Sequence, residues 1–287
     1  MKSFILINLL IILTSPTQSP VQVRSTSEKT LEQYQAAAAD YARQGRKQNA
    51  VEALRHVARL KPDDALTHYQ LGIELVGLGL FLEATESLSK AIQLAPAMAE
   101  AHRELCVARY NLQHYSLAID SCREAVRLTP DFSIAYHDLA MSLFASGRSA
   151  EAIDAVKLAI KLQPDFAEAY DTLGYFQYKT GNLKSAVESL KQALQIKSDY
   201  AEAHNDLAIV FYKMHRYREA LDLLSQATKL RANYSQAYFN LGVTHAALKN
   251  KDAALETYRV LLSFDAPMAN KLFAELFKEK IVVARRK

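Results

Sequence analysis

The sequence contains none of the short motifs that mark the common catalytic and metal sites. It has no G-x-x-x-x-G-K phosphate loop, because Leu78 follows Gly77 where the lysine would stand. It also has no G-x-S-x-G elbow, no H-E-x-x-H zinc motif and no C-x-x-C pair. The chain therefore gives almost no support for an enzyme, and we expect no cofactor and no metal site.

Concentrated charge is also missing. The formal net charge is +4, and the one basic run, residues 285–287, is confined to the end of the chain. A nucleic-acid-binding surface needs a basic face rather than a short basic tail. We therefore expect no nucleic-acid partner.

Long apolar runs are scarce, and the one that stands out lies at the N-terminus. Lys2 is followed by an apolar stretch over residues 4–13 and then by polar residues 14–19. This order is typical of a secretory signal peptide, and the stretch is too short for the ~20 residues that a membrane span needs. We predict a signal peptide at 1–19, a polar linker at 20–30, and a secreted or periplasmic protein. Because Pro20 follows the small residues of the cleavage site, an uncleaved short anchor is the alternative.

What the chain has in abundance is a 34-residue period. Four prolines and two series of alanines recur at this step along most of the sequence. Several series that share one period of 20 to 50 residues indicate a repeat protein. The prolines are Pro62, Pro96, Pro130 and Pro164; the alanines are Ala50, Ala84, Ala118, Ala152, Ala186, Ala220 and Ala254, and, with one residue of slip at the start, Ala58, Ala91, Ala125, Ala159, Ala193 and Ala227.

The unit at residues 167–200 illustrates what one period encodes. Apolar residues recur at helical spacing on both sides of the segment 180–182. Gly181 in this segment can take the positive φ that ends a helix. Gly174 and Ala186 stand where two antiparallel helices would face each other, so the backbones could approach closely. Each unit is therefore predicted to be a helix, a tight turn, a second helix and a short loop.

These positions resemble the tetratricopeptide repeat (TPR) family. Tyr170-x-x-Leu173-Gly174, followed by Ala186 and Ala193, matches the TPR pattern, although tyrosine or histidine fills the large ring position because the chain has no tryptophan. The resemblance implies an all-α fold, a right-handed α-solenoid of seven helix–turn–helix units. The units are expected at residues 31–64, 65–98, 99–132, 133–166, 167–200, 201–234 and 235–268.

The segment 269–287 follows the last predicted unit. An open solenoid end exposes an apolar face and needs a cap with a polar outer side. Leu272 and Leu276 fall on one side of a helix here, whereas Lys271 and Glu275 fall elsewhere. We predict a capping helix followed by a basic tail.

The chain has two cysteines, Cys106 and Cys122. They fall on the first and second helices of one predicted unit, and the facing helices would bring them near each other. A disulfide is one interpretation, for an oxidising compartment. The other is a pair of buried thiols that act as small apolar fillers.

The functional surface is expected on the inner, concave side of the solenoid, which the first helix of each unit lines. Aromatic rings recur there at the twelfth position of four successive units, and Tyr175 stands at a ninth position. Amphipathic rings suit the binding of an extended peptide or a helix. The alternative is that the rings only pack between units. The predicted ligand groove comprises Tyr110, Phe144, Tyr175, Tyr178 and Tyr212, with Arg103, His137, Asp171, Asn205, Lys179 and Lys213 around them.

The sequence thus predicts a non-catalytic protein–protein interaction scaffold that binds a peptide or protein segment in its groove. The repeats also look similar to the TPR arm of the protein O-GlcNAc transferases, without a catalytic domain; Asp138, Asp206 and Asn240 occupy that family's asparagine slot. Two alternatives stay open. One is a targeting or substrate-presenting subunit of a separate enzyme such as a glycosyltransferase, and the other is a self-associating structural solenoid. No membrane contact is expected beyond a signal peptide or short anchor.

Overall fold

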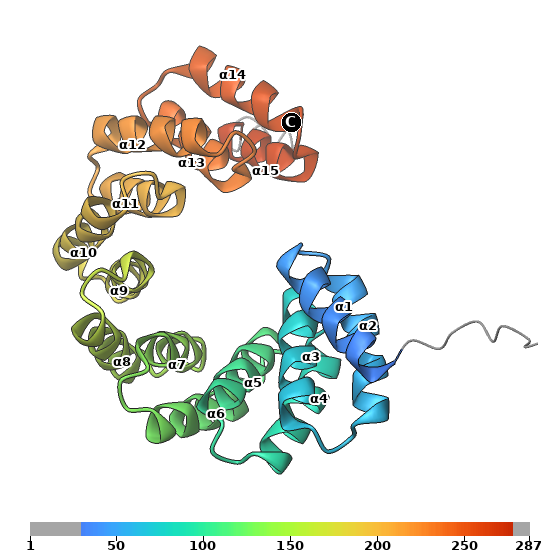
Figure 1. The fold of residues 1–287 in the computed structure, drawn as a ribbon. Coiled ribbons are helices and arrows are strands. Elements are labelled where there is room, and N and C mark those ends of the chain that lie inside the picture. Colours follow the sequence, from blue (N-terminus) through green and yellow to red (C-terminus); the bar gives the residue numbers. More distant parts are fainter. Residues whose placement is uncertain (1–29, 278–287) are drawn as a thin grey trace, which may run out of the picture.

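The computed structural model describes residues 30–277, which form a curved stack of helix pairs (Figure 1). The predicted signal peptide, nearly all of the linker and the basic tail lie outside the described residues. Residues 30–277 form 15 helices and no strand, so the predicted all-α solenoid is confirmed. Among these helices, none combines the length and the apolar character that crossing a membrane would require.

The odd-numbered helices from α1 to α13 are the first helices of the pairs. In Figure 1, α5, α7, α9 and α11 lie on the inner side of the arc, and their partners lie on the outer side. Each begins at the first residue of a 34-residue period. Their bounds are α1 (Leu31–Arg43), α3 (Ala65–Gly77), α5 (Ala99–Asn111), α7 (Ser133–Ala145), α9 (Ala167–Lys179), α11 (Ala201–Lys213) and α13 (Ser235–Ala247).

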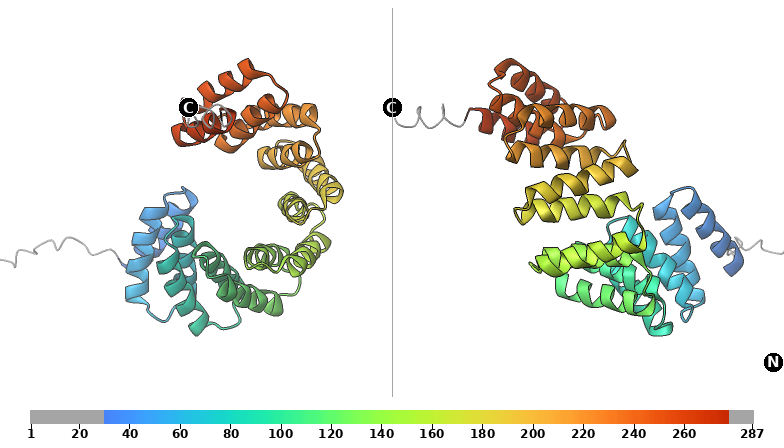
Figure 2. Two further views of the ribbon diagram at one scale, coloured as in Figure 1. Left: turned by 180° about the vertical axis from the view of Figure 1, so that it is seen from behind. Right: turned by 90° about the vertical axis from the view of Figure 1, so that its left-hand side faces the viewer.

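The even-numbered helices complete the pairs. Each packs against the first helix of its own pair and against the helix that follows it, which is the first helix of the next pair or, for α14, α15 (Figure 2). The core is therefore a strip between two helix layers, because each unit contacts mainly its neighbours. The second helices are α2 (Lys47–Leu60), α4 (Phe81–Leu94), α6 (Tyr115–Leu128), α8 (Ser149–Leu162), α10 (Leu183–Ile196), α12 (Tyr217–Leu230) and α14 (Lys251–Leu262).

Every turn within a pair places one residue in the left-handed region of the backbone. The φ angle is +86° at Gly181 and +60° at His215, one period further on. Glycine adopts this conformation without a steric penalty, whereas a side chain there is strained. The full series is Gly45, Gly79, Gln113, Gly147, Gly181, His215 and Lys249. Because three units keep the turn without glycine, the packing of the two helices imposes the conformation.

Close approach of the two helices depends on small residues in the contact. A Cβ atom on Gly174 in α9 would lie 2.5 Å from Cγ of Leu190 in α10. Leu190 itself is fully buried, so its side chain fills the space that the missing Cβ leaves. The expectation that Gly174 faces the second helix of its unit is confirmed.

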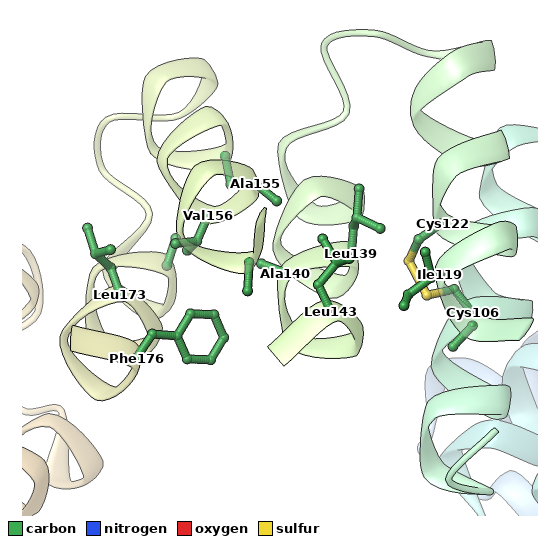
Figure 3. Close-up of a cluster of buried hydrophobic side chains, with 14 residues drawn as sticks. Cys106, Ile119, Cys122, Leu139, Ala140, Leu143, Ala155, Val156, Leu173 and Phe176 are labelled. Atoms are coloured by element: carbon green, nitrogen blue, oxygen red, sulfur yellow. A yellow bond between two sulfur atoms is a disulfide. The ribbon is translucent and has the colours of Figure 1, made fainter. Parts of the chain in front are cut away.

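One buried cluster runs through the middle of the solenoid, from α5 to α9 (Figure 3). At one end of it, Cys106 in α5 and Cys122 in α6 form a disulfide, and their Cα atoms lie 5.3 Å apart. The structure therefore contains the disulfide rather than two thiols. At the other end, Phe176 of α9 is fully buried and points towards α7.

The C-terminal end of the described chain carries the helix α15 (Ala266–Leu276). It begins three residues before the position at which the capping segment was expected. The Asp265 side chain accepts a hydrogen bond from the Met268 N–H at 3.0 Å, and a proline occupies the first turn, so the start of the helix is well specified. Leu272 is fully buried against Gly242 of α13, and α15 covers the end of the last pair.

Candidate protein-interaction groove

The predicted groove residues all lie on four consecutive inner helices. These four helices follow one another along the inner side of the arc, and each contacts the next (Figure 1). Their burial differs greatly: Asn205 is buried, most of the others are half-buried, and Tyr175, Lys179 and Lys213 are exposed. They are Arg103 and Tyr110 on α5, His137 and Phe144 on α7, Asp171, Tyr175, Tyr178 and Lys179 on α9, and Asn205, Tyr212 and Lys213 on α11.

The aromatic rings at the twelfth position are not equivalent. Phe144 stacks on the buried ring of Phe176 in the next pair, with ring centroids 4.1 Å apart and planes 5° apart. Tyr110 packs against Tyr115, at a centroid distance of 5.7 Å, within its own pair. Phe144 therefore contributes to packing between units, as the alternative interpretation of the rings holds.

Tyr178 and Tyr212 have a different environment. Both line a hollow of about 100 Å³ between α9, α11 and α13, which we call the tyrosine hollow. Lys213 and Asn240 bring polar groups to it, and Tyr212 is held edge-on against Tyr217 at 5.1 Å. The remaining lining is Ala208, Ile209, Leu224, Val243 and Thr244.

A second, smaller hollow adjoins the first, because Tyr178 and Ile209 line both. We call it the carboxylate hollow, since Asp206 stands in its wall together with Tyr175, Leu190 and Val210. Tyr175 is 39% exposed, and the Lys179 ammonium lies 5.8 Å from the centre of its ring. Aromatic faces and a carboxylate are thus available side by side.

A ladder of polar side chains links successive inner helices. At three junctions between units, the residue at the fifth position of one unit reaches the residue at the sixth position of the next, 35 residues further along the chain. Arg103 Nε donates to Asp138 Oδ2 at 2.7 Å, His137 Nε2 lies 2.9 Å from Thr172 Oγ1, and Asn240 Nδ2 donates to Asn205 Oδ1 at 2.8 Å. We call these pairs the rungs of the polar ladder.

Asp171 and Asp206 occupy the same two positions between α9 and α11, but both of them are carboxyl groups. Burial, together with the negative charges of Asp206, Glu202 and Glu168, raises the pKa of Asp171 to about 8. Burial also raises the pKa of Asp206, to about 6. Oδ1 of Asp171 is buried and has no hydrogen-bond partner. Asp171 and Asp206 together are called the acidic rung below.

At the rung of Arg103, which lies two units earlier, the buried charges are of opposite sign and stabilise one another. Burial alone would lower the pKa of this guanidinium, but Asp138 and Glu104 raise it. Arg103 also contacts Glu104 at 2.6 Å, so its charge is shared between two carboxylates.

A hollow at the N-terminal end of the described chain was not predicted from the sequence. It measures about 300 Å³, lies between α1, α2 and α3, and is lined by Gln35, Ala39, Ala42, Leu66 and Gln70 among others. The signal was present: the ninth and twelfth positions hold Ala39 and Ala42 in the first unit, whereas the adjacent unit has Ile73 and Val76 there. Small residues in the first unit leave this space open.

Histidines at the large ring position have a structural role. Nε2 of His68, His102 and His204 each lies 2.9 to 3.0 Å from a backbone carbonyl oxygen six residues earlier. Over residues 30–277, no group of three or more His, Cys, Asp or Glu side chains is arranged to hold a metal ion.

Comparison with known protein families identifies the repeats. Family models described as TPR repeat and tetratricopeptide repeat match residues 69–131, 134–166, 174–215 and 205–269, which together exceed half of the chain. No curated protein sequence matches it significantly.

Solved structures with this fold were also found. One is a chain of the APC/C hetero-tetramer Cut9–Hcn1, with a TM-score of 0.70 and 19% identity over 86% of this chain; this chain spans only 49% of that one. Another is a tetratricopeptide repeat protein from Parabacteroides merdae, with a TM-score of 0.70 and 13% identity, covering 86% of this chain and 98% of that one.

A third is YrrB, described as a TPR protein with an unusual peptide-binding site, with a TM-score of 0.50 and 19% identity over 66% of this chain and 97% of that one. At these identities the neighbours show the fold alone. Together with the family models, the helix pairs and their 34-residue period show that this chain belongs to the tetratricopeptide repeat family.

Proposed function

We propose that this protein binds a peptide or protein segment of a partner on the inner surface around α9, α11 and α13. TPR repeats are protein-interaction scaffolds, and the fold is generally non-catalytic. The observation that carries the proposal is the tyrosine hollow, in which two half-buried rings, Lys213 and Asn240 converge on one concave space. Apolar walls with a few converging polar groups are typical of binding sites.

The tyrosine hollow is preferred over the larger hollow between α1 and α3. Rigid aromatic rings provide large contact areas at low entropic cost and are enriched among residues that dominate binding energy. The N-terminal hollow owes its size to alanines and offers no ring at the equivalent positions. The peptide-binding site described for YrrB supports the same type of function on this fold.

Selection of random peptides displayed on phage by the full chain tests the proposal. A selected peptide is then labelled, and its dissociation constant is measured by fluorescence anisotropy for the wild type and for Tyr178→Ala and Tyr212→Ala. Removing an aromatic anchor commonly costs about 2 kcal/mol, so each variant is expected to bind roughly 30-fold more weakly.

Tyr258→Ala is the matched control. Tyr258 is also a half-buried tyrosine, but it lies on the outer helix α14 and packs against Phe273 at 5.5 Å. It should leave peptide binding unchanged, while all three variants keep melting temperatures within a few degrees of each other. Failure to enrich any peptide, or full binding by both hollow variants, would refute the proposed function.

We further propose that the protein is exported. The support is the order of residues 1–19, a charged start, a short apolar stretch and a polar end, which is typical of a signal peptide. Mass spectrometry of the protein recovered from its native source should find a chain that lacks these residues, or a membrane-attached chain that keeps them. An intact Met1 on protein from the cytoplasmic fraction would exclude export.

A further inference from the structure

Two positions of the repeat form the close contact between the helices of a pair. The eighth residue of a unit lies on the first helix, and the twenty-fourth lies on the second. A glycine or alanine at the eighth position leaves a gap, and a leucine or valine at the twenty-fourth fills it. The pairs of this kind are Ala38 and Leu54, Gly72 and Leu88, Ala140 and Val156, Gly174 and Leu190, and Ala208 and Leu224.

The third unit departs from this pattern, because Cys106 and Cys122 occupy the two positions. Together they carry as many side-chain heavy atoms as an alanine with a valine, but the two side chains are equal in size. Both are fully buried, and the disulfide joins them across the contact between α5 and α6 (Figure 3). Cys106 Sγ also lies 3.6 Å from Ser142 Oγ in α7, so the bond stands beside the junction with the next unit.

Reduction of the disulfide would disturb the packing at this contact. Two sulfur atoms that are not bonded need more room than a bonded pair, and a close-packed protein interior provides it only through a shift of its neighbours. Neither thiol supplies the branched side chain that fills the gap in the other units. The reduced pair would therefore hold α5 and α6 together less firmly than the disulfide does.

The turn of the third unit is a second reason why this unit depends on the bond. Gln113 adopts a φ of +61°, in the left-handed region where a side chain is strained. Two other units lack glycine in the turn, but a leucine fills their close contact: Leu224 in the sixth, and Leu272 of α15 against Gly242 in the seventh. Within residues 30–277, the third unit alone combines a strained turn with a contact that no leucine or valine fills.

We propose that the disulfide between Cys106 and Cys122 is a redox-dependent lock on the third unit, and that this unit is the first part of the solenoid to open when the bond is reduced. The N-terminal hollow lies before this unit and the tyrosine hollow after it. The lock therefore fixes the position of one hollow relative to the other. This inference does not depend on peptide binding by either hollow.

The chemistry of the lock is thiol–disulfide exchange. A dithiol reductant supplies two electrons and two protons; the bond between the sulfur atoms breaks, two cysteine thiols form, and the reductant becomes a disulfide. Because both cysteines are fully buried, a reductant reaches the bond only through local opening of the unit. The lock is therefore set when the chain folds, and it closes in an oxidising compartment.

The size and the place of the effect follow from the architecture. The two cysteines are 16 residues apart in the sequence, and a cross-link over a loop of this length shifts the opening equilibrium by roughly a hundredfold. Each unit of a solenoid contacts mainly its neighbours. Loss of the bond should therefore be felt most in α5 and α6 and least in distant units.

Hydrogen exchange followed by mass spectrometry on the full chain tests the lock. The oxidised chain is compared with a chain that has been unfolded, reduced with dithiothreitol and refolded in the same reductant. We expect the amides of residues 99–128 to exchange at least about tenfold faster in the reduced chain, and those of α11 and α12 to change less than about twofold. Because the sequence has two cysteines in all, the reductant has no other target.

The double variant Cys106→Ala, Cys122→Val is the matched control. It gives the third unit the pair that Ala140 and Val156 form in the fourth. The variant should exchange like the oxidised wild type, with and without dithiothreitol. If it does not fold, the comparison of the oxidised and reduced wild type still decides.

Four results would overturn the proposal. Equal exchange of residues 99–128 in the two wild-type states would mean that the thiols pack as well as the bond. Equal acceleration in every unit would mean that the bond supports the whole chain and not the third unit. A double variant as labile as the reduced chain would assign the weakness to side-chain volume. Two free thiols in chain folded in an oxidising glutathione buffer would show that the lock does not close.

Discussion

The rung at Arg103 and the rung at Asp171 occupy the same place in the repeat, two units apart, and differ in nearly every physical property. Arg103 bridges Asp138 and Glu104, and the buried charges compensate one another. Asp171 is largely buried and faces carboxylates, and burial together with these negative charges raises its pKa to about 8. One backbone framework thus supports one rung whose charges compensate each other and another whose carboxyl groups have no compensating cation among the described contacts. The difference lies in side-chain chemistry alone.

The largest loss of stability is expected when Arg103 is replaced by a carboxylate, so that its rung resembles the acidic rung. Arg103→Asp would place a third carboxyl group beside Asp138 and Glu104, with no cation to neutralise them. Uncompensated buried charges destabilise by several kcal/mol, so the free energy of unfolding should fall by about 4 kcal/mol at pH 7. Urea unfolding followed by circular dichroism measures this, and an unchanged midpoint would show that the rung carries little energy.

Removing a carboxylate charge from the acidic rung should stabilise the protein. Because the folded pKa of Asp171 lies above its ordinary value of 3.8, the native state binds the extra proton. The stability that depends on this group is complete below about pH 4 and is lost as the pH rises towards about 8. Asp171→Asn should remove that loss, so the variant should be more stable than the wild type at pH 8 and nearly unchanged at pH 4.

The exposed carboxylate of Asp222, on the outer helix α12, is the control for this comparison. Asp222→Asn should leave the unfolding free energy within about 0.5 kcal/mol of wild type at both pH values. A parallel gain in both variants would attribute the effect to net charge instead of to the acidic rung.

Breaking the neutral rung between Asn205 and Asn240 should lower the free energy of unfolding by an intermediate amount. Asn205 is buried and accepts a hydrogen bond from Asn240 at 2.8 Å. Asn240→Leu would leave the Asn205 carbonyl oxygen without this donor, and we expect a loss of about 1 kcal/mol. Unlike the loss at the acidic rung, it should be the same at pH 5 and pH 8, which a pair of urea titrations would decide.

The smallest effect is expected at the rim of the acidic rung. Arg231 and Glu202 form a largely exposed ion pair, and exposed pairs contribute little because water and salt screen them. Arg231→Gln should change stability by about 0.5 kcal/mol or less, and the change should vanish in high salt. A larger, salt-resistant loss would mean that Arg231 helps to neutralise the buried carboxylates.

Much of the fold could be read from the chain. The 34-residue period predicted helix pairs, Gly174 indicated the close approach of two helices, and Gly181 indicated a turn. The same turn at His215 was less evident, since its conformation comes from helix packing and not from the residue. The start of α15 was displaced from its expected place, because Asp265 and the following proline begin a helix before the period ends.

The candidate site was less predictable. Sequence spacing placed the aromatic positions on the inner helices, but it treated Phe144 and Tyr212 alike. The contact of Phe144 with Phe176 depends on the angle at which successive pairs pack, as does the space left beside Tyr212. The sequence analysis named both Asp171 and Asp206. That the two carboxyl groups act on each other depends on the register between α9 and α11, which the sequence does not give.

The sequence by itself determined the repeat, the helix pairs and the layer to which each helix belongs, because these follow from local periodicity and from contacts between neighbouring units. The tertiary structure decided which rings pack and which line a hollow, that the two cysteines are bonded, and that one rung joins two carboxyl groups. Those properties depend on distances between side chains 16 to 35 residues apart, which the superhelical geometry sets and a one-dimensional pattern does not contain.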